Sequence, residues 1–201
     1  MTELAGPLAI AAGVLAVGGA LKLVDPAATR TMLTALRLPS GAWVARGLGL
    51  VELAAGLAAL IAGGPVAAAA VAGLYLVFAG VAGSLMRADG AAASCGCFGR
   101  LSAPASWIHV AFDLVAATIA AAAAAAGTPG LVEVEVGGPL SRLSFLGLVA
   151  VGTWFGVACL TVLPATMAAA SRRPARVPVR ELLIHEFPVH RGRMPHDEAG
   201  R

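Results

Sequence analysis

Charged residues are scarce in this sequence of 201 residues: Asp, Glu, Lys and Arg make up 12% of it, whereas about 25% is typical of soluble proteins. Hydrophobic residues make up 59%. A water-soluble core of this size could not bury so many apolar side chains, so a soluble enzyme is excluded. Intrinsic disorder over most of the chain is excluded as well, because disordered segments are poor in apolar residues. The composition indicates a membrane protein.

Cysteine is scarce too. The three cysteines are too few and too unevenly spaced for the disulfide framework of a small secreted protein. The sequence also lacks a phosphate-binding loop, a nucleophile elbow and a zinc-protease motif. The formal net charge of +3 is explained by membrane orientation, and no nucleic-acid recognition motif is visible. We therefore expect neither nucleic acid as a partner nor a bound cofactor.

Five stretches reach the length of about 20 apolar residues that a transmembrane helix needs. They predict an all-α integral membrane protein, a bundle of five transmembrane helices in a lipid bilayer. The fourth stretch is rich in alanine, and small residues suit close packing between helices. Between the second and third stretches stand only Gly63, Gly64 and Pro65, which predicts an antiparallel hairpin. The predicted spans are 4–24, 42–63, 65–87, 107–126 and 143–170.

Three further segments lie outside these spans. Residues 26–39 mix apolar and basic side chains, which favours a short amphipathic helix at the membrane interface, with a solvated connector as the alternative. Residues 131–136 alternate Val with Glu, which indicates a short strand or an extended loop. The residues after 170 are rich in Arg, Pro and His and predict a mobile tail with one short helix at 179–184. The predicted domains are a four-helix domain at 1–126, a loop and fifth helix at 127–170, and the tail at 171–201.

The distribution of basic residues predicts the orientation. Of the 14 Lys and Arg residues, all except Arg142 lie in or beside the first connection, the third connection and the tail. Cytoplasmic segments of membrane proteins carry an excess of Lys and Arg. We therefore expect a multi-pass protein of the plasma membrane with its N-terminus outside and its tail in the cytoplasm. The third connection, which contains two of the cysteines, is then cytoplasmic.

Cys95 and Cys97 stand two residues apart in this short polar connection. Their Cα atoms can separate by about 7 Å at most, just above the usual disulfide range of about 4.4–6.8 Å, so a bent Cys-Gly-Cys segment can close. The small ring would be strained, and strained exposed disulfides are the reducible, catalytic ones. Arg100 and the start of the next helix favour the nucleophilic thiolate. Cys97 lies nearer to both, so we predict Cys97 as the attacking thiol and Cys95 as the resolving thiol.

Other interpretations of the cysteines stay open. The pair can be merely two small residues in a loop of Gly, Ala and Ser. Together with His109 it can supply part of a zinc site, but a structural zinc site needs four ligands and the sequence shows no fourth nearby, so we expect no metal. Cys159 lies in the fifth span and is interpreted as a small buried hydrophobic residue.

In its Cys-Gly-Cys-Phe-Gly segment at 95–99, placed between the third and fourth helices, the sequence resembles the MauE family of membrane proteins from methylamine utilisation clusters. The resemblance covers residues 4–126 and implies a four-helix membrane domain related to DoxX-like proteins. It also implies a role in the methylamine metabolic process, in which the disulfide-rich small subunit of methylamine dehydrogenase matures with the help of a thioredoxin-like partner. Such disulfides form outside the cytoplasm, whereas the basic residues place the cysteine loop inside.

Ionisable residues inside the predicted spans are functional candidates, because a buried charge in a membrane is expensive. Glu52 lies about 13 Å and Asp113 about 9 Å from the same membrane face, and Arg46 and His109 enter from that face on the same two helices. We expect these four residues to cluster below the cysteine loop, where a carboxylate or His accepts a thiol proton. Alternatively, Arg46 pairs with Asp113 only to hold the helices together. Glu52 has no partner at its own depth, so we expect it to be protonated or exposed to water.

The sequence thus predicts a membrane protein that supports thiol–disulfide exchange through Cys95 and Cys97, with a thioredoxin-like protein or a disulfide-rich client as its partner. The competing hypothesis is a non-catalytic membrane assembly factor or transporter subunit. In that case the cysteine loop is structural, and the charges inside the membrane line a path or an interface.

Overall fold

The computed structural model describes residues 2–88, 95–134 and 137–171. Contacts divide the chain after Ala169 into two units, and the first unit, Met1–Ala169, contains the site described below. Five helices in the described part are long and apolar enough to cross a membrane, which confirms the all-α fold and the five predicted spans. They are α1 (Ala5–Val24), α3 (Ala42–Ile61), α4 (Gly64–Ala88), α5 (Trp107–Ala126) and α6 (Pro139–Ser171).

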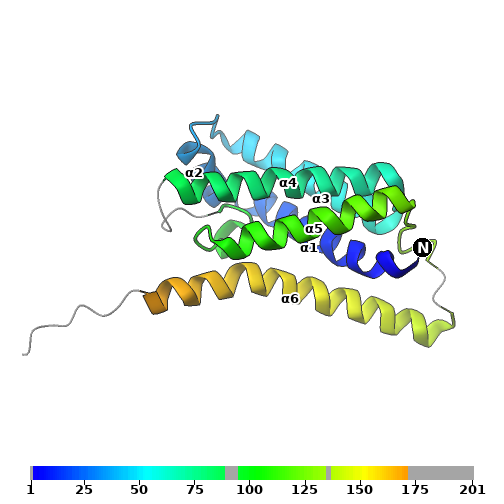
Figure 1. Cartoon of the computed structure of the whole chain (residues 1–201). Coiled ribbons are helices and arrows are strands. Elements are labelled where there is room, and N and C mark those ends of the chain that lie inside the picture. Colours follow the sequence, from blue (N-terminus) through cyan, green and yellow to red (C-terminus); the bar gives the residue numbers. More distant parts are fainter. Residues whose placement is uncertain (1, 89–94, 135–136, 172–201) are drawn as a thin grey trace, which may run out of the picture. The chain divides into compact units, whose positions relative to one another are not determined.

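Helices α1 and α3 pack closely because glycines line their contact (Figure 1). A Cβ atom on Gly19 would lie 2.5 Å from the carbonyl oxygen of Gly49, and one on Gly56 would lie 2.7 Å from that of Ala12. Side chains at these glycines would therefore push the helices apart. Small residues allow this approach between helices in membranes, where lipid provides no hydrophobic drive for association.

Helices α4 and α5 form the second close pair, and the core lies between the two pairs. The alanine run of α5 contributes buried residues to this core, as small residues do where helices approach closely. Tyr75 of α4 crosses the core and donates a hydrogen bond to the Ala11 carbonyl oxygen of α1 at 2.7 Å. Its ring meets those of Phe78 and Phe112 edge to face. One buried tyrosine therefore ties α4 to α1 and α5.

The predicted hairpin between the second and third spans is present, with a turn at Gly63 and Gly64. Both glycines have positive φ, +65° and +81°, which other residues rarely adopt. The segment after α5 packs on this turn, with Gly64 donating to the Thr128 carbonyl oxygen at 2.8 Å. Residues 131–133 form a turn instead of the strand or extended loop expected for 131–136, because their N–H groups donate hydrogen bonds to α3 and to Gly130. Residues 135–136 and the helix expected at 179–184 lie outside the described residues.

The segment between α1 and α3 contains the expected short helix, α2 (Ala27–Ala35). Thr29, Met32 and Leu33 form its buried face, whereas Arg30 and Thr31 are exposed. This pattern is amphipathic, as predicted. The buried face packs on the cysteine loop, so α2 covers the candidate site.

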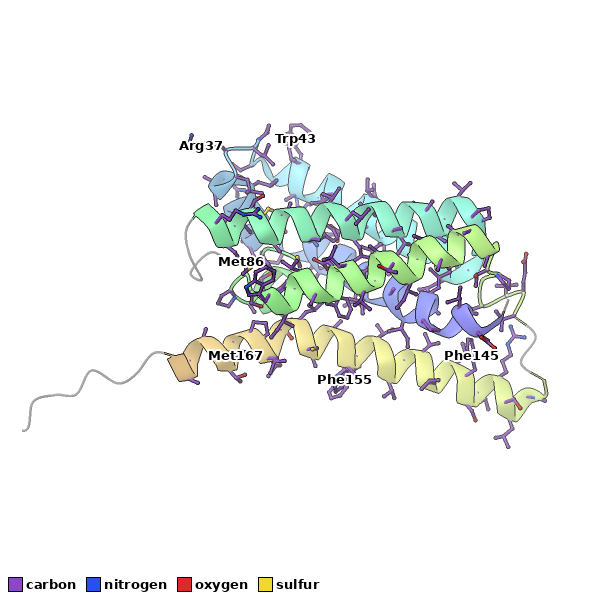
Figure 2. All side chains as sticks on the ribbon, in the orientation of Figure 1. Arg37, Trp43, Met86, Phe145, Phe155 and Met167 are labelled. Carbon is purple, nitrogen blue, oxygen red and sulfur yellow. The ribbon has the colours of Figure 1, made fainter. Side chains whose placement is uncertain are left out.

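Helix α6 begins at Pro139, four residues before the predicted start of the fifth span, since proline fits the first turn of a helix well. It contacts α1 through Gly152 and Gly156, which face Ile10 and Val14. Its other surface is apolar and open: Trp154 and Phe155 are 70% and 66% exposed, and Figure 2 shows Phe155 pointing away from the other helices. Such a surface fits a lipid bilayer.

Candidate functional site

The cysteine loop is held in a fixed bend by two hydrogen bonds and by a glycine at its centre. Cys95 donates its backbone N–H to the Ala103 carbonyl oxygen at 3.1 Å. The hydroxyl of Thr29, on α2, donates to the Gly96 carbonyl oxygen at 2.8 Å. Gly96 has a φ of +67°, and a Cβ atom there would lie 2.9 Å from the Cβ of Met32. Only glycine therefore fits between the two cysteines without strain or displacement of α2.

Cys95 contacts His109, the first of the predicted site residues on α5. Its Sγ lies 3.3 Å from His109 Nε2, and both side chains are buried. On the other side of the ring, Nδ1 lies 3.0 Å from the hydroxyl of Ser106, which precedes α5. Contacts at both nitrogens fix the orientation of the imidazole, as in sites where a histidine activates a nucleophile.

The two thiols are free and have opposite properties. A hydrogen bond from Cys97, with further help from His109, holds the pKa of Cys95 well below its usual range in spite of burial. The same hydrogen bond, burial and the negative charges of Cys95 and Asp113 raise the pKa of Cys97, although Lys22 opposes them. A lowered pKa favours the thiolate form of Cys95, and the thiolate is the nucleophilic form of a cysteine.

The sequence predicts Cys97 as the attacking thiol, whereas the lowered pKa and the histidine contact favour Cys95. In the sequence, Arg100 and the start of the next helix lie nearer to Cys97 and favour its thiolate form. The Arg100 side chain lies outside the described set, and α5 directs His109 toward Cys95. The histidine therefore contacts the sulfur of Cys95 and not that of Cys97, which is nearer in sequence to the helix.

Glu52 has a partner that the sequence did not indicate. Lys22 of α1 lies 2.7 Å from Glu52 Oε2, and both side chains are almost completely buried. The same ammonium donates to the Cys97 carbonyl oxygen at 2.6 Å and lies 5.5 Å from the centre of the Phe78 ring. The expectation that Glu52 is unpaired is therefore wrong. Lys22 instead links α1, α3 and the cysteine loop.

Arg46 does not join this cluster. Its side chain is exposed, and its Nε donates to the Leu23 carbonyl oxygen at 3.4 Å. Among the residues that the structure describes, the one ion pair found is that of Lys22 with Glu52, so the considered pair of Arg46 with Asp113 is not formed. Glu52, His109 and Asp113 do come together, as expected, but with Lys22 in the place given to Arg46.

These groups surround a cavity in the bundle with a volume of about 20 Å³, enough for about one water molecule. Cys97 lines this cavity, whereas Cys95 does not line it and packs with Met32 and Leu85. The cavity is lined by Val14, Leu15, Gly18, Lys22, Glu52, Tyr75, Phe78, Cys97, Phe98, His109, Asp113 and Leu160. The dithiol thus lies beside a cavity that is lined by two carboxyl groups, those of Glu52 and Asp113.

The remaining candidates add nothing to this site. Cys159 is half-buried on α6. No group of three or more possible metal ligands occurs within residues 2–88, 95–134 and 137–171. The chemistry that the arrangement supports is nucleophilic attack by a buried thiolate with a second thiol beside it.

The part of the chain that contains this site resembles a known family. The family model described as methylamine utilisation protein MauE matches residues 3–127, more than half of the chain. The matched part contains α1 to α5, the cysteine loop and every side chain of the cavity except Leu160. Neither the curated proteins nor the solved structures give a match.

Proposed function

Because the chain belongs to the MauE family of membrane proteins, we propose that it carries out thiol–disulfide exchange through Cys95 and Cys97. The observation that carries this proposal is the contact of 3.3 Å between Cys95 Sγ and His109 Nε2. A histidine at this distance stabilises a thiolate, and a thiolate is the form that attacks disulfides. Cys97 is within reach to resolve the intermediate, because its thiol donates a hydrogen bond to the Cys95 carbonyl oxygen at 3.5 Å and also interacts with the Cys95 sulfur.

The exchange proceeds in two steps. The Cys95 thiolate attacks one sulfur of a partner disulfide, which forms a mixed disulfide and releases the other partner sulfur as a thiolate. That thiolate takes the proton held by His109. Cys97 then loses its proton and attacks Cys95 Sγ, which breaks the mixed disulfide. The partner gains two electrons and two protons, and Cys95 and Cys97 become a disulfide; the reverse sequence oxidises a partner dithiol.

A thioredoxin-like protein or a disulfide-rich client is the partner class that fits this chemistry. In a methylamine utilisation system the client is the small subunit of methylamine dehydrogenase, whose disulfides form outside the cytoplasm. With the cysteine loop on the cytoplasmic side, a second carrier must then pass electrons across the membrane. The excess of basic residues supports a plasma-membrane protein with its N-terminus outside and its tail in the cytoplasm. A reporter fused after Arg201 is then active in the cytoplasm only, and activity outside would reverse this orientation.

A redox titration tests the proposal. The full chain with Cys159→Ala is equilibrated with buffers of defined thiol and disulfide ratio, and free thiols are then labelled with a maleimide of high mass. Both remaining thiols should become protected together over a narrow range of potential. Cys95→Ser, in the same background, should leave Cys97 labelled throughout. Two thiols that stay labelled at every potential, including strongly oxidising ones, would rule out a working dithiol.

A further inference from the structure

The cavity beside Cys97 brings together ionisable groups from four helices and the loop. Lys22 comes from α1, Glu52 from α3, Tyr75 from α4, and His109 and Asp113 from α5. Helix α6 contributes only the apolar Leu160. The exchange chemistry proposed above uses His109 and the two cysteines, and leaves both carboxyl groups without a role.

Glu52 is only half satisfied in this position. Its Oε2 accepts a hydrogen bond from Lys22, but its Oε1 is buried and has no hydrogen-bond partner among the described residues. Buried polar atoms are nearly always hydrogen-bonded to protein or to ordered water, because a buried acceptor without a partner destabilises the fold. The adjoining volume of about 20 Å³ meets the requirement for one water molecule.

Cys97 needs a proton acceptor in the second step of the exchange. The hydrogen bond to Cys95 and burial raise the pKa of its thiol, so the thiol needs a base in order to ionise. His109 contacts Cys95 Sγ through Nε2 and the Ser106 hydroxyl through Nδ1, and no hydrogen bond between His109 and Cys97 is found among the described residues. Asp113 lines the same cavity as Cys97, and no hydrogen bond or ion pair of its carboxyl group is found within the described ranges. Asp113 is therefore placed to take this proton across the cavity.

We propose that the cavity is a water site, anchored by Glu52 Oε1, through which the proton of Cys97 passes to Asp113. The water accepts the Sγ proton of Cys97 and gives one of its own to the Asp113 carboxylate, so its composition is unchanged. The Cys97 thiolate then attacks Cys95 Sγ, and the second partner sulfur leaves as a thiolate. Asp113 finally returns its proton to solvent or to the departing thiolate. This inference rests on the proposed thiol–disulfide exchange.

The test follows the two steps separately in the full chain with Cys159→Ala. The probe is 4,4′-dithiodipyridine, a small disulfide that releases a coloured thione. One equivalent is released when Cys95 attacks and a second when Cys97 resolves the mixed disulfide. Asp113→Asn should keep the first phase and slow the second at neutral pH by about 100-fold or more, the usual range for loss of a general base. The second-phase rate should then rise with pH, because solvent hydroxide must take the proton.

A second variant fills the cavity and removes no ionisable group. A methyl group at Gly18 would lie 3.2 Å from the Cys97 carbonyl oxygen and 3.6 Å from Glu52 Oε2. Gly18→Ala should therefore displace the water and slow the second phase by a smaller factor. Glu133→Gln is the matched control for a lost carboxylate, because Glu133 is exposed outside the cavity, and it should leave both phases unchanged.

The outcomes separate this inference from the proposed function. An unchanged second phase in Asp113→Asn would overturn the proton path while leaving the exchange chemistry intact. An equal slowing of both phases would also overturn the proton path, because Asp113 would then act only by stabilising the fold. Absence of a second phase in the parent, or its persistence in Cys97→Ser, would reject the dithiol itself. Restoration of the second phase by Asp113→Glu would support the assigned role, because that variant keeps the carboxylate.

Discussion

Lys22 and Glu52 form an ion pair, 2.7 Å long, that is buried between α1 and α3. The pair stands where Gly19 and Gly49 bring the two helices into backbone contact. Because Lys22 also donates to the Cys97 carbonyl oxygen, the same ammonium holds the cysteine loop against the bundle.

Removal of Lys22 should strongly destabilise the protein, because Glu52 would remain buried without its counter-charge. Breaking a buried pair in this way typically costs about 3–5 kcal/mol. Lys22→Met should therefore lower the unfolding midpoint in detergent, and the double variant with Glu52→Gln should recover part of the loss. Arg46→Met is the control, since Arg46 is exposed and makes one long hydrogen bond. Equal effects of Lys22→Met and Arg46→Met would contradict the assigned pair.

His109→Asn should make Cys95 a weaker nucleophile at neutral pH. The His109 contact is one of the causes that lower the Cys95 pKa, so its loss raises that pKa and reduces the thiolate fraction. The rate of iodoacetamide alkylation of Cys95, measured against pH with Cys159→Ala, should rise at higher pH than in the parent. Cys97→Ala should shift the profile in the same direction, because the thiol hydrogen bond is the larger cause. A profile that does not move in either variant would show that neither contact stabilises the thiolate.

The glycine contact between α1 and α3 should tolerate no side chain. Gly19→Ala places a methyl group 2.5 Å from the Gly49 carbonyl oxygen, and overpacking of this kind typically costs about 1–3 kcal/mol. Unfolding of the purified protein in detergent measures the loss. Gly73→Ala on α4 serves as the control, because a Cβ atom there meets nothing within 4 Å. If both variants were equally stable, the helices would not be as close as described.

Thr29 should control access to Cys95. Cys95 is 1% exposed, and the hydroxyl of Thr29 ties α2 to the loop at Gly96. Thr29→Val keeps the shape but removes this hydrogen bond, which should weaken the docking of α2 by about 1–3 kcal/mol. Alkylation of Cys95 should then be faster at a pH where its thiolate fraction is unchanged. Thr31→Val is the control, because Thr31 is exposed and bonds only within α2. A rate equal to that of the parent would mean that α2 does not limit access.

The helices could be predicted from the sequence because their signal is local. Runs of about 20 apolar residues, the glycines of the turn at 63–64 and the amphipathic pattern of α2 each lie within one segment. The sequence also predicted that the cysteine loop lies near Glu52, His109 and Asp113, since the depths of these residues are measured from the same membrane face as the loop. These predictions required no knowledge of which helix faces which.

The partner of Glu52 could not be predicted in this way, because depth was assigned from position along each helix alone. Side chains on a helix tilt toward its N-terminus. Lys22 stands near the C-terminal end of α1, so its side chain is directed inward to Glu52. Arg46 stands near the N-terminal end of α3, so its side chain is directed outward. The contact between His109 and Cys95 could not be predicted for a related reason: the rotation of α5, which directs His109 to Cys95, is set by packing and not by the loop sequence.

The most direct test of the central claim compares Cys97→Ser with Cys95→Ser, each in the full chain with Cys159→Ala. Each variant is mixed with a cysteine peptide that carries a pyridyl disulfide, and intact masses are measured before and after reduction. Cys97→Ser keeps the attacking thiol and lacks the resolving one, so it should accumulate a reducible peptide adduct on Cys95, whereas Cys95→Ser should react far more slowly. Equal adduct formation by the two variants, or adduct formation by Cys95→Ser alone, would contradict Cys95 as the nucleophile.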